Sequence, residues 1–276
     1  MVRSLADTPE KTPAPAGNRW SDLNARTWTG LCMVAVGIVG IRLGGVWFQM
    51  LVVFVTAVMI WELARMIRPG WDVGSMLLAA FSASVISGLL SQAPDWHLLL
   101  LLVPAVAGSA VMPRERFTFF LFALGITIAG WGLVTARDSF GGTWLFWMVI
   151  VVVVTDVAGY FAGRHFGGPK FWPAISPKKT WSGTAAGWIG AGLVGALFLT
   201  FTDSGRDLIW ISMLLSMASQ AGDIMESALK RRLGVKDSSS LIPGHGGLFD
   251  RFDGLLGASL FMLLLALIVD VPRVNI

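Results

Sequence analysis

Residues 143–162 read TWLFWMVIVVVVTDVAGYFA, and this stretch decides the fold class. Apart from Asp156 it is apolar on every side of a helix, and its length matches the roughly 20 residues that cross a bilayer core of about 30 Å. A strand of a membrane barrel would alternate in polarity instead. The stretch therefore predicts a membrane-spanning helix.

The composition of the whole chain agrees with this prediction. Hydrophobic residues make up 55% of the sequence and charged residues only 14%, whereas soluble domains carry about 25% charged residues. Further apolar runs predict an all-α, polytopic transmembrane helical bundle of about nine helices. Their expected ranges are 27–41, 43–64, 73–91, 95–112, 117–135, 143–162, 183–201, 207–229 and 254–271.

The sequence divides the chain into three expected parts. Residues 1–25 are rich in proline and polar residues and are expected to form a disordered cytoplasmic tail. Residues 26–142 hold few ionisable groups and are expected to be scaffold helices, with Glu62 interpreted as an interfacial group at a helix end. Residues 143–276 are expected to form the catalytic membrane helices and cytoplasmic loops.

The distribution of basic residues predicts the orientation. With the N-terminus in the cytoplasm, 17 of the 21 Lys and Arg residues fall on the cytoplasmic side, where such residues accumulate. Only Arg42, Arg137, Arg206 and Arg273 fall outside. The net charge of +4 then reflects contact with anionic membrane lipid and an anionic substrate, and no nucleic acid is needed to explain it.

Charge is concentrated in the segment Ser227–Asp253, SALKRRLGVKDSSSLIPGHGGLFDRFD, between two apolar runs. Membrane proteins rarely place so much charge there without a use for it. Carboxylates in and before the segment can bind divalent cations, and its basic residues suit a polyphosphate or a lipid head group. The candidate metal ligands are Asp223, Glu226, Asp237, Asp250 and Asp253, and the candidate phosphate-binding cations are Lys230, Arg231, Lys236 and Arg251.

Asp156 interrupts an apolar run and requires a cation, a proton or a water-filled cavity. The alternative is a structural neighbourhood with Arg164, bridged by Tyr160. The following loop, ISPKKTWSG at 175–183, combines two lysines and several hydroxyls after a Ser-Pro turn. Ser176, Lys178, Lys179 and Thr180 are therefore candidate phosphate-binding residues, although paired lysines beside a membrane also serve as plain topology determinants.

Small residues recur at four-residue spacing in the next helix, at Gly183, Gly187, Ala191 and Gly195. Such a strip allows close approach of another helix. The partner is either a helix of the same chain, which we prefer, or a second subunit in a homodimer.

Taken together, these motifs resemble a known signature. The run Ser227-x-x-Lys230-Arg231, then Lys236-Asp237, then PGHGG at 243–247 followed by Asp250-Arg251-x-Asp253, resembles that of the bacterial phosphatidate cytidylyltransferases. Residues 156–163, 176–183 and 220–223 are similar to other polar landmarks of that family. Two departures are Ser182, where a glutamate is expected, and Ser238-Ser239, which replace an apolar residue and a glycine.

The resemblance implies an enzyme that converts CTP and phosphatidate into CDP-diacylglycerol and pyrophosphate, with one or more Mg²⁺ ions. It also implies a bacterial inner-membrane location with the active site facing the cytoplasm. Asp223 and Asp250 are the first expected metal ligands, with Glu226, Asp237 and Asp253 as further ligands or neighbours. The phosphates of the two substrates would be divided among six basic residues: Lys178, Lys179, Lys230, Arg231, Lys236 and Arg251. His245, Gly246 and Gly247 would shape a loop whose backbone N–H groups approach the nucleotide.

Two competing interpretations differ in class. A CDP-alcohol phosphotransferase requires a D-G-x-x-A-R pattern, which fails after Asp253-Gly254. An ion-coupled transporter would use Asp156, Asp223 and Glu226 as an intramembrane cation site. That alternative predicts repeated halves, which are not found, and leaves the dense polar loop unexplained.

Overall fold

The computed structural model describes residues 19–92, 95–242, 244–268, 272 and 274. The tail predicted over residues 1–18 lies outside these residues. Its last part is corrected, because helix α1 already begins at Arg19 and includes residues 19–25. No proline follows Pro15 before Leu43, so nothing in the sequence stops the helix from extending toward its N-terminal side.

Helices make up the fold, as predicted. In chain order they are α1 (Arg19–Leu43), α2 (Gly45–Ile67), α3 (Asp72–Gln92), the 3₁₀ helix η1 (Asp95–Leu101), α4 (Leu102–Val111), α5 (Arg116–Phe166), α6 (Trp181–Phe198), α7 (Asp207–Arg232) and α8 (Phe249–Leu265). Within the described residues, four helical stretches are long and apolar enough to cross a membrane: Gly45–Ile67, Asp72–Ser91, Arg116–Phe166 and Asp207–Arg232. The count of about nine crossings stays a prediction.

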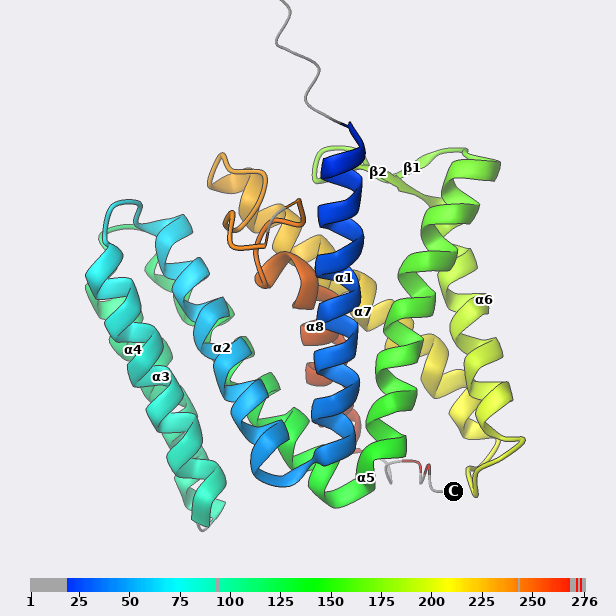
Figure 1. Ribbon diagram of the computed structural model, residues 1–276, viewed down its shortest axis with the longest axis horizontal. Coiled ribbons are helices and arrows are strands. Elements are labelled where there is room, and N and C mark those ends of the chain that lie inside the picture. Colours follow the sequence, from blue (N-terminus) through cyan, green and yellow to red (C-terminus); the bar gives the residue numbers. More distant parts are fainter. Residues whose placement is uncertain (1–18, 93–94, 243, 269–271, 273, 275–276) are drawn as a thin grey trace, which may run out of the picture.

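Helix α5 joins two of the predicted membrane helices. Its 51 residues would extend about 76 Å if straight, more than twice the thickness of a bilayer core. The backbone is not helical at Gly141, where φ is 87°. A positive φ is easily adopted by glycine, so α5 turns there and forms two legs, 116–140 and 142–166 (Figure 1).

A short hairpin was not predicted. Strand β1 (Lys170–Trp172) pairs antiparallel with β2 (Ser176–Thr180), between α5 and α6. Thr180 then caps α6, because its hydroxyl accepts a hydrogen bond from the N–H of Gly183 at 3.2 Å. The segment expected to be a phosphate-binding loop is thus mostly a β-strand with a fixed exit into a helix.

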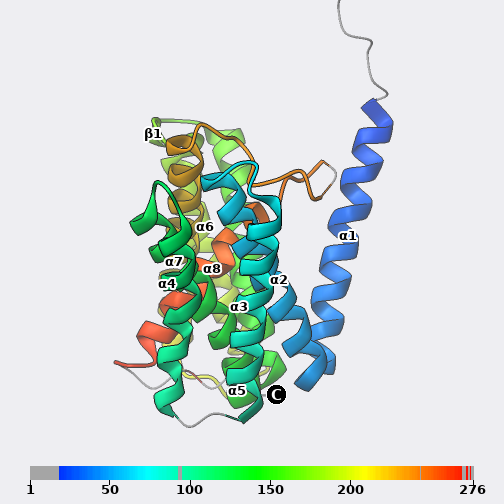
Figure 2. The ribbon, with the colours of Figure 1, turned by 90° about the vertical axis from the view of Figure 1, so that its left-hand side faces the viewer.

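The C-terminal leg of α5 packs with α6, α7 and α8, while α2, α3, α4 and the first leg of α5 form the other side of the bundle (Figure 1). Helix α1 stands apart from the rest over much of its length (Figure 2). The two sides share a core in which Ile60 and Leu63 of α2 join Leu229 of α7 and Phe249 of α8, all nearly or fully buried.

Close helix packing uses the predicted strip of small residues on α6. A Cβ at Gly183 would collide with backbone of α5, one at Gly187 with the side chain of Gln220 on α7, and one at Gly195 with backbone of α7. Ala191 is fully buried. The strip therefore packs against helices of the same chain, as preferred from the sequence.

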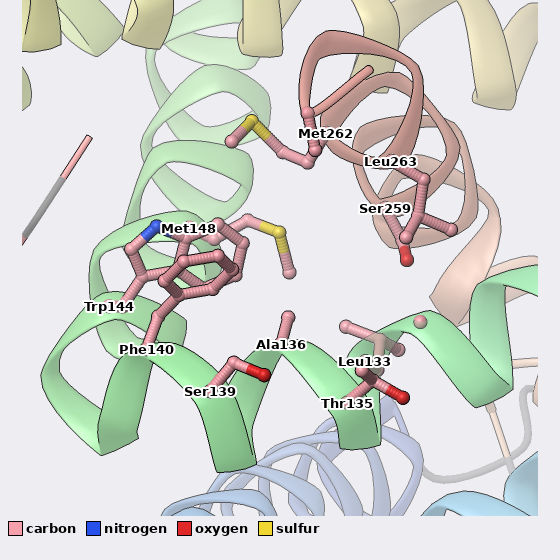
Figure 3. A pocket seen from close by; sticks show the side chains of 12 residues that line it. Leu133, Thr135, Ala136, Ser139, Phe140, Trp144, Met148, Ser259, Met262 and Leu263 are labelled. Carbon is pink, nitrogen blue, oxygen red and sulfur yellow. The ribbon is translucent and has the colours of Figure 1, made fainter. Parts of the chain in front are cut away.

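A cavity of about 200 Å³ lies between α5 and α8. Phe140, Trp144 and Met148 of α5 face Met262 and Leu263 of α8 across it (Figure 3). Its lining residues are all uncharged, so this cavity does not supply the phosphate chemistry that the sequence indicates.

Candidate active site

The candidate site lies where α7 and α8 cross. A Cβ at Gly222 of α7 would overlap the carbonyl oxygen of Asp253, and one at Gly257 of α8 would overlap that of Ala218. Only glycine permits this approach. The crossing sets Asp223, the next residue of α7, beside the first turns of α8, which carry Asp250, Arg251 and Asp253.

The β-hairpin contributes one of its two lysines to this crossing. Lys179 Nζ lies 2.5 Å from Asp223 Oδ2, and both side chains are partly buried. Lys179 also lies 3.5 Å from the backbone oxygen of Gln220 on α7. The structure therefore brings Lys179 of β2 to Gln220 and Asp223 of α7, whereas Lys178 is exposed.

Lys230 joins two buried carboxylates. Its Nζ lies 2.6 Å from Glu226 Oε2, one helical turn away, and 2.5 Å from Asp250 Oδ1. The side chains of Glu226 and Asp250 are 1% and 4% exposed, so the ammonium group offsets two charges that water scarcely reaches. Glu226, a candidate metal ligand from the sequence, is paired with Lys230 in this structure.

Both carboxylate oxygens of Asp250 are already bound by donors from the protein. Its Oδ2 accepts hydrogen bonds from the N–H of Gly247 at 2.7 Å and from the N–H and hydroxyl of Ser238, each at 2.9 Å. These bonds fasten the loop 238–247 to the start of α8. The N–H of Gly247, one of the backbone groups expected to approach the nucleotide, is hydrogen-bonded to Asp250 in this structure.

Asp156, Asp223 and Asp253 face a common region from three different helices. Each is within electrostatic range of the other two, and Lys179, Lys230 and Arg251 act on members of the group from its edges. Arg164 donates to the Tyr160 hydroxyl at 2.8 Å, while no ion pair joins Arg164 to Asp156 among the described residues. Of the structural alternative for Asp156, the structure builds the contact between Arg164 and Tyr160.

His245 is engaged by the N-terminal helix. Its Nδ1 lies 2.8 Å from the hydroxyl of Thr29 on α1. Its backbone oxygen accepts hydrogen bonds from Nε and Nη2 of Arg251 at 3.0 and 2.8 Å. The GHGG turn is therefore held on one side by α1 and on the other by α8.

Several predicted site residues remain outside these contacts. Arg231 is exposed at the end of α7, Lys236 and Asp237 are exposed on the turn after it, and Ser176 is partly exposed on β2. Gln220, which was noted only within the landmark 220–223, accepts a hydrogen bond from Trp188 Nε1 at 2.9 Å. Glu62 of α2 was missed from the sequence, and it binds the loop that carries Ser238. A carboxylate inside an apolar helix was the available signal for Glu62.

The donor set suits magnesium, which prefers oxygen ligands and commonly uses one or two carboxylates together with substrate phosphates and water. Asp223 and Asp253 fit this role best, since they lie at the glycine crossing and repel each other electrostatically. Among the described residues, no group of three or more His, Cys, Asp or Glu side chains is arranged to hold an ion. An ion held here would therefore take its remaining ligands from substrate and water.

Comparisons with known proteins identify the family of this chain. A sequence model of the cytidylyltransferase family matches residues 24–269. The phosphatidate cytidylyltransferase of Brucella suis biovar 1 is 33% identical over 264 residues, covering 92% of this chain and 97% of that protein. That of Bacillus subtilis is 32% identical over 256 residues, covering 85% and 94%. The resemblance seen in the polar motifs thus extends over nearly the whole chain, and the protein belongs to the cytidylyltransferase family.

Proposed function

We propose that this protein is a phosphatidate cytidylyltransferase that uses CTP. The observation that carries the proposal is the similarity to proteins of that name over 92% of the chain. The pairing of Lys179 with Asp223, from segments about forty residues apart, supplies matching chemistry. The ion-coupled transporter is not favoured, because the same carboxylates are explained by membership of a transferase family.

The proposed reaction exchanges one phosphorus–oxygen bond for another. A phosphate oxygen of phosphatidate forms a bond to the α-phosphorus of CTP, and the bond from that phosphorus to the bridging oxygen of pyrophosphate breaks. Both reactants are anionic, so the site must neutralise charge and hold the attacking and leaving oxygens in line. Phosphatidate is already ionised near neutral pH, and no strong general base is required.

The basic residues have distinct positions for this task. Lys179 and Lys230 are held by carboxylates and can exchange those partners for phosphate oxygens, while Lys178, Arg231 and Lys236 are exposed at the same end of the bundle. Ser176 and Thr180 add hydroxyl groups on β2. Asp223 and Asp253 would hold Mg²⁺, with Asp250, Glu226 and Asp237 as further candidates. The ion would supply charge neutralisation on the reacting phosphates.

We place the site at the cytoplasmic face of the bacterial inner membrane. The β-hairpin, the C-terminal end of α7 and the start of α8 lie toward the same end of the bundle (Figure 1), which is the end that carries most of the basic residues in the charge distribution. CTP would arrive from the cytoplasm, and phosphatidate would enter sideways from the lipid of the inner leaflet.

The test is an assay of purified protein with CTP, phosphatidate and Mg²⁺. The expected result is pyrophosphate release that depends on phosphatidate, with formation of CDP-diacylglycerol, loss of activity on chelation and recovery on addition of Mg²⁺. Replacing phosphatidate by diacylglycerol, which lacks the attacking phosphate, is the matched control. Pyrophosphate release that does not require phosphatidate would contradict the proposal.

A further inference from the structure

Glu62 is a fully buried carboxylate in α2, on the N-terminal side of the bundle. Burying such a group in a membrane helix is costly unless it is well hydrogen-bonded. Its two oxygens are within hydrogen-bond distance of four donors, and all four belong to the catalytic segment. They are the N–H of Leu248 at 3.0 Å, the N–H of Phe249 at 2.7 Å, the Ser239 hydroxyl at 2.6 Å and the Ser238 hydroxyl at 3.2 Å.

Two of these contacts cap α8 from a distant helix. The N–H groups of Leu248 and Phe249 stand at the start of α8, where no partner exists inside the helix, and the N-cap residue Leu248 provides no side-chain bond. Glu62 supplies the missing acceptors. Its negative charge is also favourable at the positive end of the helix dipole.

One of the other two contacts also reaches Asp250. The Ser238 hydroxyl lies 3.2 Å from Glu62 and 2.9 Å from Asp250, so it stands between the two carboxylates, whereas the Ser239 hydroxyl contacts Glu62. Ser238 and Ser239 are the pair that departs from the family signature, and both find their partner in Glu62. At Gly247 a Cβ would overlap both Glu62 and the Ser238 hydroxyl, so this glycine is required by the same contact.

From these contacts we propose that Glu62 is a positioning residue for the reaction, an inference that rests on the proposed function. Through the start of α8 and through Ser238, it sets where Asp250 and Asp253 stand relative to Asp223 and Lys230. Ile60 and Leu63 of α2 also pack against Phe249 of α8 in the same buried cluster. Helix α2 is then part of the catalytic assembly and not only a scaffold.

The principal test is Glu62→Gln, which places an NH₂ donor where the carboxylate accepts N–H and O–H groups. We expect kcat/KM to fall about 10- to 100-fold, as is usual when a group that orients a metal ligand is lost. Most of the fall should be in kcat, and half-maximal activity should require more Mg²⁺. Hydrogen exchange of the amides in 246–253, measured without substrate, should become faster.

Two further variants separate positioning from stability. Glu62→Asp keeps both acceptor oxygens on a shorter side chain and should recover part of kcat. Glu115→Gln is the matched control, because Glu115 binds Arg232 Nη2 at 2.9 Å at the end of α7, away from Asp250. It should lower thermal stability at most, with kcat and Mg²⁺ dependence unchanged.

A folded Glu62→Gln protein that loses thermal stability but keeps the wild-type kcat, KM and Mg²⁺ dependence would overturn the proposal. If Glu62→Gln does not fold, the Ser239→Ala variant tests the proposal in its place, since it removes only one of the four donors to Glu62. Lower kcat with faster exchange in 246–253 supports positioning, and wild-type kinetics overturns it. Failure of the proposed function would be seen earlier, as absent CDP-diacylglycerol formation by the wild-type protein.

Discussion

At the residue scale, Asp223 and Asp250 differ in how they are held. Asp223 is 30% exposed and pairs with Lys179, whereas Asp250 is 4% exposed and binds Lys230, Ser238 and Gly247. Both were the first expected metal ligands. Their surroundings indicate that Asp250 has a structural duty that Asp223 lacks.

Asp223→Asn and Asp250→Asn should therefore both abolish turnover, with different effects on stability. Loss of a ligand in phosphoryl transfer should lower the rate about a thousandfold or more. Asp250→Asn should also lower the melting temperature, because it removes one of the two carboxylates paired with Lys230 and one of the two acceptor oxygens that hold Lys230, Ser238 and Gly247. Assays and thermal unfolding of both purified variants check this. Near-normal activity in either folded variant would remove that residue from the catalytic group.

The two lysines of β2 should differ in how much their loss lowers catalytic activity. Lys179→Ala loses a charge-assisted contact worth about 1.5–3 kcal/mol, so kcat/KM should fall at least about tenfold. Lys178→Ala, next to it and exposed, serves as the control with a smaller effect. Steady-state kinetics with CTP and phosphatidate varied in turn measures both. Equal, wild-type kinetics in the two variants would reduce the hairpin to an anchor.

At the scale of elements, the crossing of α7 and α8 places the carboxylates. Gly222→Ala would press a Cβ against the carbonyl of Asp253 and force the helices apart. Overpacking of this kind costs about 1–3 kcal/mol, and the shift should lower kcat because Asp223 and Asp253 separate. Gly88→Ala in α3 is the matched control, since its Cβ would meet nothing within 4 Å. Activity and melting temperature of both variants test the crossing. Wild-type activity in Gly222→Ala would show that the close approach is not required.

At the scale of the whole molecule, orientation in the membrane is the open prediction. The tail and the segments 163–182 and 230–253 should be cytoplasmic, and residue 276 should lie outside. Single cysteines introduced at 178, 245 and 206, in a background with Cys32→Ser, can be labelled in intact cells with an impermeant thiol reagent. Position 206 should react and positions 178 and 245 should not. Labelling of 178 and 245 from outside would reverse the orientation.

The sequence by itself determined the class of this protein and most of its chemistry. Hydropathy over about 20 residues is a local property, and it predicted the helical bundle and both legs of α5. Spacing along a helix is also local, so the stripe from Asp223 to Lys230 and the small residues of α6 could be recognised, as could the family signature. The position of the α5 turn was also indicated, since it falls between the two predicted helices.

Only the tertiary structure decided which distant groups meet. The contact between Glu62 and Phe249 spans 187 residues, and no periodicity in the sequence encodes such a pairing. Sequence therefore interpreted Glu62 as an interfacial group. The fold instead uses it to hold the start of α8, because the N–H groups at a helix end must find acceptors outside the helix. Helix crossing angles and the packing of side chains settle that choice, and they exist only once the chain is folded.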